Sequence, residues 1–338
     1  MFGLITVSGV LIGIVYGGLI GFAGWGQTRI GGQIGAVHGG IIAVCIGLLE
    51  LYAVRTSVGK RIERTPLVMT ILIKGLIYGT VILTVEFGNI GEMVVLGYVS
   101  DKKTTLAFTP LSIAFSFIII FIILFILQIS HQVGGRTLCN LVLGRYHRPR
   151  MEERFFLFVD VVGSTRIAET VGPLAMHRFL NRVFALIADP VADQSGEIYQ
   201  YVGDQIVITW RVASGRPTSH PLTCFFAIQS ALADARERFE ADFGVTPTVR
   251  GALHAGCVVA GEVGVNRRSI VFHGDVMNVG ARIEQATRDL KCLFLMSRDA
   301  MRRLEGTAGY RARNRGPLKL RGRQAAVEVF EITRKTKD

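Results

Sequence analysis

Two aspartates occur where the sequence predicts turns next to apolar strands. Asp160 ends the run FFLFVD at 155–160, which has the pattern of a buried strand. Asp204 belongs to a Gly-Asp pair between the β-rich runs IYQYV and QIVITW, a pattern that predicts a hairpin. A single aspartate in a turn is ordinary turn chemistry. Two of them brought together could bind hard cations, because Mg²⁺ commonly binds through one or two carboxylates and substrate phosphates.

The segment that follows Asp160 is rich in small residues and precedes a predicted helix. It comprises Val161, Val162, Gly163, Ser164 and Thr165. The first N–H groups of a helix have no partner within the helix, and they favour anions. The segment therefore predicts a turn that holds a polyphosphate beside the two carboxylates.

A second pair of polar residues lies on a helix predicted over 275–290. Asn278 and Arg282 are four residues apart, so they share a helix face. An amide beside a guanidinium suits a ribose oxygen and a phosphate oxygen. The alternative is an ordinary solvated helix face.

The elements that position these residues belong to a mixed domain. Helical patterns run from 165 to about 190 and from Ser219 to Gly244, residues 248–264 resemble a strand pair, and a last hairpin is predicted near 318–332. Strands and helices do not alternate strictly. This favours an α+β domain with helices on one face of a mainly antiparallel sheet.

The N-terminal part has the composition of a membrane domain. Four apolar stretches, at 2–24, 34–54, 66–86 and 108–130, are long enough to span a bilayer. The first lacks the basic start and the cleavage site of a signal peptide, so we expect it to be retained. The predicted layout is a four-helix transmembrane domain (1–130), a cytoplasmic linker or coupling segment (131–153), a globular domain (154–333) that carries the candidate site residues, and a basic tail (334–338).

Charged residues around these spans predict their orientation. The loop 55–64 carries four basic residues, and 136–150 follows the last span with more. Basic loops stay in the cytoplasm. Both termini and the globular half are therefore expected there, with the lipid bilayer as a partner.

The predicted spans contain ionisable residues and a strip of glycines, and each of these features could serve packing or a further role. His38, Glu50 and Lys74 form either structural polar contacts or part of a sensing site, so an unknown membrane ligand or protein regulator stays open as a partner. A glycine strip in the first span predicts close helix packing. We favour packing within the bundle over a dimer seam. The strip comprises Gly9, Gly13, Gly17 and Gly21.

Composition excludes several other classes. Half of the residues are hydrophobic and 19% are charged, which excludes a disordered chain. The net charge of +12 is not interleaved with aromatic platforms, so nucleic acid is not expected as a partner. The 5 cysteines include no CxxC pair, which argues against disulfides and zinc. A Walker-type GxxxxGK[ST] motif is absent from the sequence.

The order of the motifs resembles a known family. FVDVVGST at 158–165, YVGDQI at 201–206 and HGDVMNVGAR at 273–282 are similar to the catalytic pattern of class III nucleotidyl cyclases. The resemblance covers about residues 150–333. The lead-in LGRYHRP at 143–149 is similar to that of a bacterial, membrane-anchored branch with four N-terminal helices. This branch implies a multi-pass protein of the bacterial inner membrane.

The resemblance implies a fold, an assembly and two metal ligands. The fold would be α+β around a ferredoxin-like core, and the active sites would form between two catalytic domains arranged head to tail in a homodimer. Asp160 and Asp204, helped by the Val161 carbonyl, would bind two Mg²⁺ or Mn²⁺ ions per site.

Three further residues match substrate-contacting positions of the family. Asn278 and Arg282 would come from the other protomer, orient the ribose and stabilise the transition state. Arg321 would contact the terminal phosphates.

The base-recognition positions depart from the family pattern. Adenine-selecting members usually carry Lys at the position of Gln200. They usually carry Asp or Thr at the position of Val271. Gln can donate and accept hydrogen bonds, whereas the Val side chain can do neither. ATP is favoured as substrate from the family branch. The alternatives are a guanylate or dual-specificity cyclase and a catalytically silent receptor or nucleotide-binding module.

Overall fold

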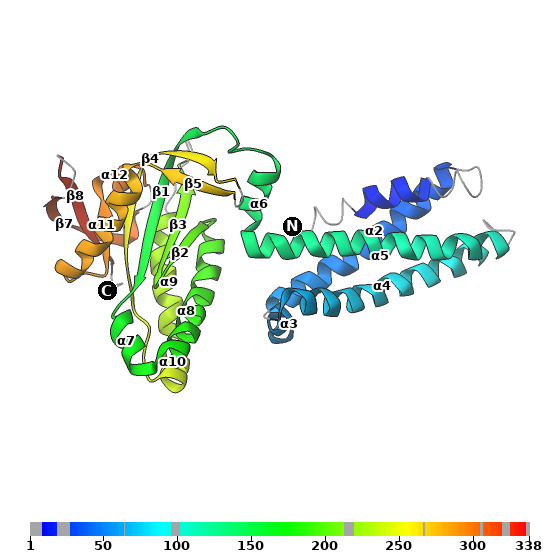
Figure 1. Ribbon diagram of the computed structural model, residues 1–338, viewed down its shortest axis with the longest axis horizontal. Coiled ribbons are helices and arrows are strands. Elements are labelled where there is room, and N and C mark those ends of the chain that lie inside the picture. Colours follow the sequence, from blue (N-terminus) through cyan, green and yellow to red (C-terminus); the bar gives the residue numbers. More distant parts are fainter. Residues whose placement is uncertain are drawn as a thin grey trace. The chain divides into compact units, whose positions relative to one another are not determined.

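The computed structural model divides the chain into two compact units, Met1–Gly135 and Arg136–Asp338 (Figure 1). The boundary falls inside the segment predicted as a linker. The residues that the structure describes are 9–18, 28–63, 65–95, 102–212, 220–265, 268–304, 307–319 and 325–335.

The N-terminal unit is helical. Three of its helices contain a window that is long and apolar enough to cross a membrane: Gly32–Glu50, Leu67–Val85 and Ile113–Ser130. Within the predicted span 2–24 the structure describes the short apolar helix Gly9–Gly18, and the rest lies outside the described residues. Three of the four predicted spans are thus supported. The long helices of the unit are α2 (Thr28–Arg55), α4 (Leu67–Val95) and α5 (Lys102–Val133), and the short helix α3 (Ser57–Glu63) follows α2.

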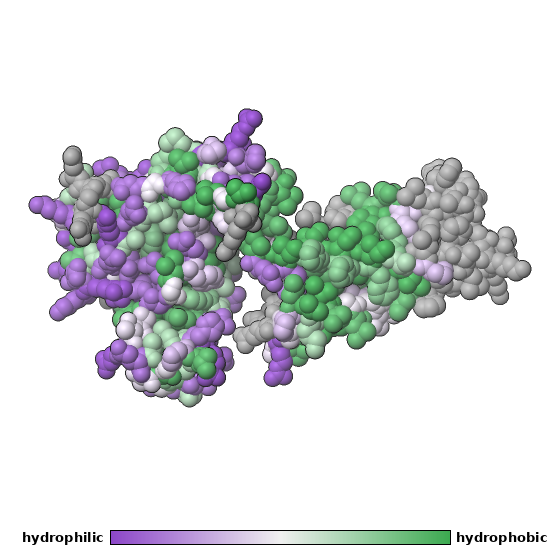
Figure 2. Space-filling model, viewed as in Figure 1, coloured by the Kyte–Doolittle hydropathy of each residue, from purple (hydrophilic) through white to green (hydrophobic). Residues whose placement is uncertain are grey.

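Large apolar side chains cover the outside of these helices (Figure 2). Leu72, Leu76 and Phe121 are 62%, 76% and 56% exposed. Apolar patches of this extent are rare on proteins that face water on all sides. The surface therefore matches a lipid environment better than an aqueous one.

The glycine strip packs inside the unit. A Cβ atom added to Gly13 would lie 2.0 Å from the Gly35 carbonyl oxygen, and one added to Gly9 would lie 2.7 Å from the Gly39 oxygen. The helix Gly9–Gly18 therefore approaches α2 backbone to backbone, as small-residue helix contacts do. This supports the bundle-packing interpretation. Gly21 lies outside the described residues.

Polar residues of the N-terminal unit are satisfied locally. Lys74 Nζ of α4 donates to Glu50 Oε1 and Oε2 of α2 at 3.0 and 2.9 Å, and Tyr78 Oη donates to Glu50 Oε1 at 2.6 Å. His38 Nδ1 donates to the Ile34 carbonyl at 2.7 Å. These contacts join or stabilise helices, which supports the structural interpretation of these residues.

An eight-stranded sheet forms the centre of the C-terminal unit. Its order is β2-β3-β1-β4-β6-β8-β7, and β5 pairs with β4. Among the described residues β4 and β6 are the one parallel pair. The strands are β1 (Arg150–Val161), β2 (Glu197–Val202), β3 (Gln205–Arg211), β4 (Val249–Val263), β5 (Ser269–His273), β6 (Phe294–Ser297), β7 (Tyr310–Leu318) and β8 (Val327–Arg334).

The first four strands form the predicted ferredoxin-like core. Their spatial order is β2-β3-β1-β4, all antiparallel, with helices between β1 and β2 and between β3 and β4. The helices are α6 (Gly135–Val142), α7 (Ser164–Val171), α8 (Pro173–Asp193), α9 (His220–Asp234), α10 (Arg236–Phe243), α11 (Asp275–Asp289) and α12 (Arg298–Met301). The α+β class and the mainly antiparallel sheet are as expected.

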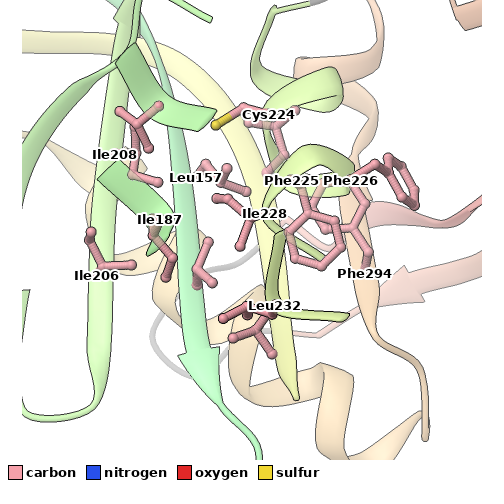
Figure 3. Packing of buried hydrophobic residues seen from close by; sticks show 14 of the residues in the cluster. Leu157, Ile187, Ile206, Ile208, Cys224, Phe225, Phe226, Ile228, Leu232 and Phe294 are labelled. Atoms are coloured by element: carbon pink, nitrogen blue, oxygen red, sulfur yellow. The ribbon is translucent and has the colours of Figure 1, made fainter. Parts of the chain in front are cut away.

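Helices cover both faces of the sheet, which corrects the expectation of one face. Successive residues of a strand point to opposite sides. Leu157 of β1 lies in a large core with Ile187 of α8 and Ile228 of α9 (Figure 3). Phe158, the next residue, lies in a second core with Val276 of α11. The helix that carries Asn278 and Arg282 therefore packs on the face opposite α8 and α9.

Several element predictions were wrong in detail. The helix predicted over 219–244 is two helices, α9 and α10, and the last hairpin spans 310–334 instead of 318–332. Residues 249–263 form one continuous strand, β4, where a strand pair was predicted over 248–264. Their glycines are close-approach positions and not turns: a Cβ on Gly251 would lie 2.7 Å from the Phe158 carbonyl oxygen, and one on Gly256 would lie 2.7 Å from Val276 Cγ2. The predicted helix 165–190 is two helices. Gly172, with φ of 80°, separates α7 from α8.

Candidate functional site

Asp160 lies one residue before the end of β1, an interior strand of the sheet. β1 is paired on both sides, so that Asp160 lies opposite Gln205 of β3 and Arg250 of β4. Asp204 immediately precedes Gln205, after Gly203, whose φ of 62° suits a tight turn. The hairpin register thus brings the two aspartates to one end of the sheet, as the sequence predicted.

Two arginines that the sequence analysis did not single out converge on Asp160. Arg250 donates to Asp160 Oδ2 from Nε at 3.1 Å and from Nη2 at 2.8 Å. Arg288, in the last turn of α11, donates to the same oxygen from Nη2 at 3.0 Å. All three bonds meet at Oδ2, and none of them uses the second carboxylate oxygen.

A third carboxylate completes the cluster. Glu284 of α11 is 2% exposed, accepts from Arg250 Nε at Oε1 at 3.2 Å and from Gln205 Nε2 at Oε2 at 3.4 Å. Arg250 therefore bridges Asp160 and Glu284. Burial, followed by the charge of Asp160, raises the pKa of Glu284 above its ordinary value.

The electrostatics of Asp160 reflect the same crowding. Burial raises the pKa of Asp160, the hydrogen bond from Arg250 lowers it, and the charge of Asp204 raises it again. The net direction is upward. A carboxyl group that is buried beside another carboxyl group favours a cation that neutralises both.

The oxygen ligands at this site are of the type that a hard divalent cation prefers, but they are few. Asp160 and Asp204 supply carboxylate oxygens side by side, which Mg²⁺ and Mn²⁺ prefer. In the parts of the chain that the structure describes, no group of three or more His, Cys, Asp or Glu side chains forms a metal site. Two carboxylates and the Val161 carbonyl therefore remain the candidate ligands, and water or substrate phosphates would complete the coordination.

The small-residue turn opens helix α7. Gly163 caps this helix with φ of 70°. The N–H of Val162 is already used, since it donates to the Thr248 carbonyl at 2.8 Å. The remaining amides of the predicted phosphate-binding segment, those of Gly163, Ser164 and Thr165, therefore lie at the start of α7, where N–H groups have no partner within the helix.

Asn278 and Arg282 lie on a different side of α11 from the aspartate cluster. Asn278 is exposed and Arg282 is partly exposed, whereas Glu284 is buried toward Asp160. Six residues separate Asn278 from Glu284, which is about one and two-thirds turns, so the two side chains leave the helix in different directions. The structure brings Asp160 and Asp204 together and leaves Asn278 and Arg282 directed away from them.

The predicted base-recognition residues occupy two strands that approach each other. Tyr199 of β2 and Phe272 of β5 have ring centroids 4.9 Å apart, and Phe272 N donates to Tyr199 Oη at 3.4 Å. Gln200 and Val271 are their immediate neighbours in sequence. Arg321 lies outside the described residues.

Sequence reasoning missed Arg250, Glu284 and Arg288. Arg250 lies in the strand predicted from 248–264, and the other two lie on the predicted helix 275–290. Their spacing of four residues could have flagged a shared helix face. The sequence contains no signal that this face meets Asp160.

Several known proteins are similar to this chain. The model of the adenylate and guanylate cyclase catalytic domain matches residues 147–333. Adenylate cyclase 2 of Rhizobium meliloti is 32% identical over 96% of this chain and 89% of its own length. The adenylate cyclase of Anabaena cylindrica is 28% identical over 57% of this chain and 38% of its own length. Among solved structures, the adenylyl cyclase CyaB of P. aeruginosa covers 56% of this chain and 98% of its own, at 18% identity and a TM-score of 0.49.

Proposed function

Because this chain belongs to the adenylate and guanylate cyclase family, we propose that it is a membrane-anchored adenylate cyclase. The reaction converts ATP to 3′,5′-cyclic AMP and pyrophosphate. The observation that carries the proposal is the meeting of Asp160 and Asp204 at the end of the central strand pair, beside the start of α7. The likeness to adenylate cyclase 2 of Rhizobium meliloti along nearly the whole chain supports ATP as the substrate.

The reaction forms one phosphorus–oxygen bond and breaks another. The ribose 3′-oxygen attacks the α-phosphorus, the bond between that phosphorus and the oxygen bridging to the β-phosphate breaks, pyrophosphate departs with the electron pair, and the hydroxyl proton passes to solvent. Two divalent cations, Mg²⁺ or Mn²⁺, would lower the pKa of the attacking hydroxyl and neutralise the triphosphate. Asp160, Asp204 and the Val161 carbonyl would hold them. The amides of Gly163, Ser164 and Thr165 would bind phosphate oxygens at the α7 start.

The positions of Asn278 and Arg282 support an active site shared between two protomers. Both face away from the Asp160 cluster of their own chain. A head-to-tail homodimer would present them to the aspartates of the other copy, where Asn278 would orient the ribose. Arg282 would stabilise charge on the transferred phosphate, and its loss would lower the rate on the order of 100- to 1000-fold.

The membrane unit supports an anchoring role. The three apolar helices and their exposed apolar surface suit a bilayer. With the helix Gly9–Gly18 as part of a fourth crossing, the catalytic unit and both termini would lie on the cytoplasmic side of a bacterial inner membrane. The basic residues of 55–64 and 136–150 support that orientation.

Product identification tests the proposal. Membranes that carry the full chain are supplied with ATP or GTP and Mn²⁺, and the nucleotides are separated and identified. We expect cyclic AMP from ATP alone, which would show that a site with Gln200 and Val271 selects adenine. Cyclic GMP, or both products, would make the protein a guanylate or dual-specificity cyclase. No product from either nucleotide would favour a silent receptor.

A pair of variants tests the metal assignment in the same membranes. Asp160→Ala removes a proposed metal ligand, so we expect turnover to be abolished while the protein stays folded and dimeric. Asp242→Ala is the control and removes an exposed carboxylate from α10. This helix packs with α8 and α9, so the change should leave the activity unchanged. Cyclase activity retained in Asp160→Ala would contradict the two-metal assignment.

A further inference from the structure

Three guanidinium N–H groups surround one oxygen of a proposed metal ligand. Asp160 Oδ2 accepts from Arg250 twice, at 3.1 and 2.8 Å, and from Arg288 once, at 3.0 Å. A divalent cation and a guanidinium are both positive, so they compete for the same carboxylate and repel each other. Metal binding at Asp160 therefore has to accommodate or displace these arginines.

Arg250 is fixed in place. Its side chain is 13% exposed, it extends from β4 directly opposite Asp160, and it also donates to the buried Glu284 at 3.2 Å. Moving it away would leave Glu284 buried without its charge partner, which is costly. Arg250 is therefore expected to stay in contact with the cluster when a metal binds.

Arg288 is held much more weakly. Its side chain is 55% exposed and extends from the last turn of α11. Over the described part of the chain, Asp160 is the one carboxylate with which it forms an ion pair. A long, half-exposed side chain can rotate into water at low cost, and the free energy of such a pair is small.

We propose that Arg288 is a displaceable counter-ion that occupies Asp160 in the metal-free enzyme and leaves when the metal enters. It neutralises charge in a site where Asp160, Asp204 and Glu284 would otherwise outnumber the single guanidinium of Arg250. Its presence raises the metal concentration that the enzyme needs. The inference rests on the proposed metal-binding role of Asp160.

Direct Mn²⁺ titration tests this role without relying on activity. The full chain in detergent, without nucleotide, is titrated with Mn²⁺ while electron paramagnetic resonance measures the free ion. Arg288→Gln removes the competing charge, so we expect Mn²⁺ to bind roughly 1.5- to fivefold more tightly, the range of an exposed ion pair. Arg288→Lys keeps the charge and should stay near wild type. Arg236→Gln serves as the matched control. Arg236 is an exposed residue of α10, a helix that packs with α8 and α9, so this change should not alter the affinity for Mn²⁺.

Two outcomes would overturn the inference, and they are distinguishable. Unchanged or weaker Mn²⁺ binding in Arg288→Gln, with binding lost in Asp160→Asn, would reject Arg288 as a competitor and leave the metal site standing. Wild-type Mn²⁺ binding in Asp160→Asn would reject the metal assignment itself, and the role of Arg288 with it.

Discussion

Single residues fix how closely helix α11 approaches the central strand. Gly280 packs against Phe158, and a Cβ atom added there would lie 2.1 Å from the ring atom Cε2. Real Cβ atoms do not approach other atoms so closely, and both residues belong to a tightly packed layer. The identity of residue 280 therefore sets the distance between β1, which carries Asp160, and the helix that carries Glu284.

Gly280→Ala should destabilise the C-terminal unit by about 1–3 kcal/mol, because the added methyl group overpacks the contact with Phe158. Thermal unfolding of the purified protein in detergent measures the effect. Gly309→Ala is the control, since a Cβ at that position meets nothing within 4 Å. An equal shift in the unfolding midpoint for both variants would contradict the steric argument.

Residue types alone flagged part of the site. Asp160 and Asp204 could be predicted because each follows an apolar run at a turn, which is a local pattern. Arg250 and Arg288 could not, because they reach Asp160 from positions 90 and 128 residues away along the chain. Nothing in the local sequence distinguishes them from solvated arginines.

At the scale of elements, a buried ionic network attaches the segment before β1 to the sheet. Arg154 of β1 is 1% exposed and donates to Glu152 Oε2 at 2.9 Å and to Tyr146 Oη at 3.1 Å. Tyr146, also 1% exposed, donates to Glu152 Oε1 at 3.1 Å. Its ring joins the same core as Val276 at the start of α11. The chain that leads out of α6 is therefore packed against the layer that supports α11.

Removing one member of this network should be strongly destabilising. Arg154→Met leaves the buried Glu152 with one charge partner fewer, so we expect a loss of about 3–5 kcal/mol. The matched control is Arg303→Met, which breaks the pair with the next residue, Glu153, whose side chain is 49% exposed. That pair should contribute less than about 1 kcal/mol. Similar unfolding midpoints for the two variants would show that burial of the network is unimportant.

At the scale of the whole molecule, the outward direction of Asn278 and Arg282 bears on where a complete active site could form. Within one chain, the side of α11 that carries Glu284 meets the cluster around Asp160. Asn278 and Arg282 lie on a different side of the same helix. In the proposed shared-site arrangement, a single protomer would therefore present two half-sites. A second copy would bring complementary halves together, as two-fold assemblies do.

Mixing two inactive variants tests this arrangement. Asp204→Ala and Arg282→Ala protomers combined in equal amounts should recover roughly a quarter of wild-type cyclase activity, because half of the dimers are mixed and each mixed dimer has one intact site. Asp204→Ala mixed with Asp160→Ala is the control. Both changes affect the same half-site, so no activity should return. A dead first mixture, with mixed dimers demonstrated by differently tagged protomers, would exclude shared sites.

The sequence by itself determined the features that depend on local pattern. Apolar stretches predicted three of the long apolar helices, the turn residues predicted the hairpin at Asp204, and four-residue spacing placed Asn278 and Arg282 on one helix face. These signals are strong because backbone conformation and hydrophobic periodicity are set within a few residues. The resemblance to nucleotidyl cyclases followed from the same short motifs.

Only the tertiary structure decided how those elements meet. It showed that 249–263 is one strand, because its glycines allow close contacts with Phe158 and Val276 instead of forming a turn. It placed α11 on the sheet face opposite α8 and α9. It also surrounded Asp160 with Arg250, Arg288 and Glu284. Each of these depends on contacts between residues far apart in the chain, and strand register and packing of the whole domain determine such contacts.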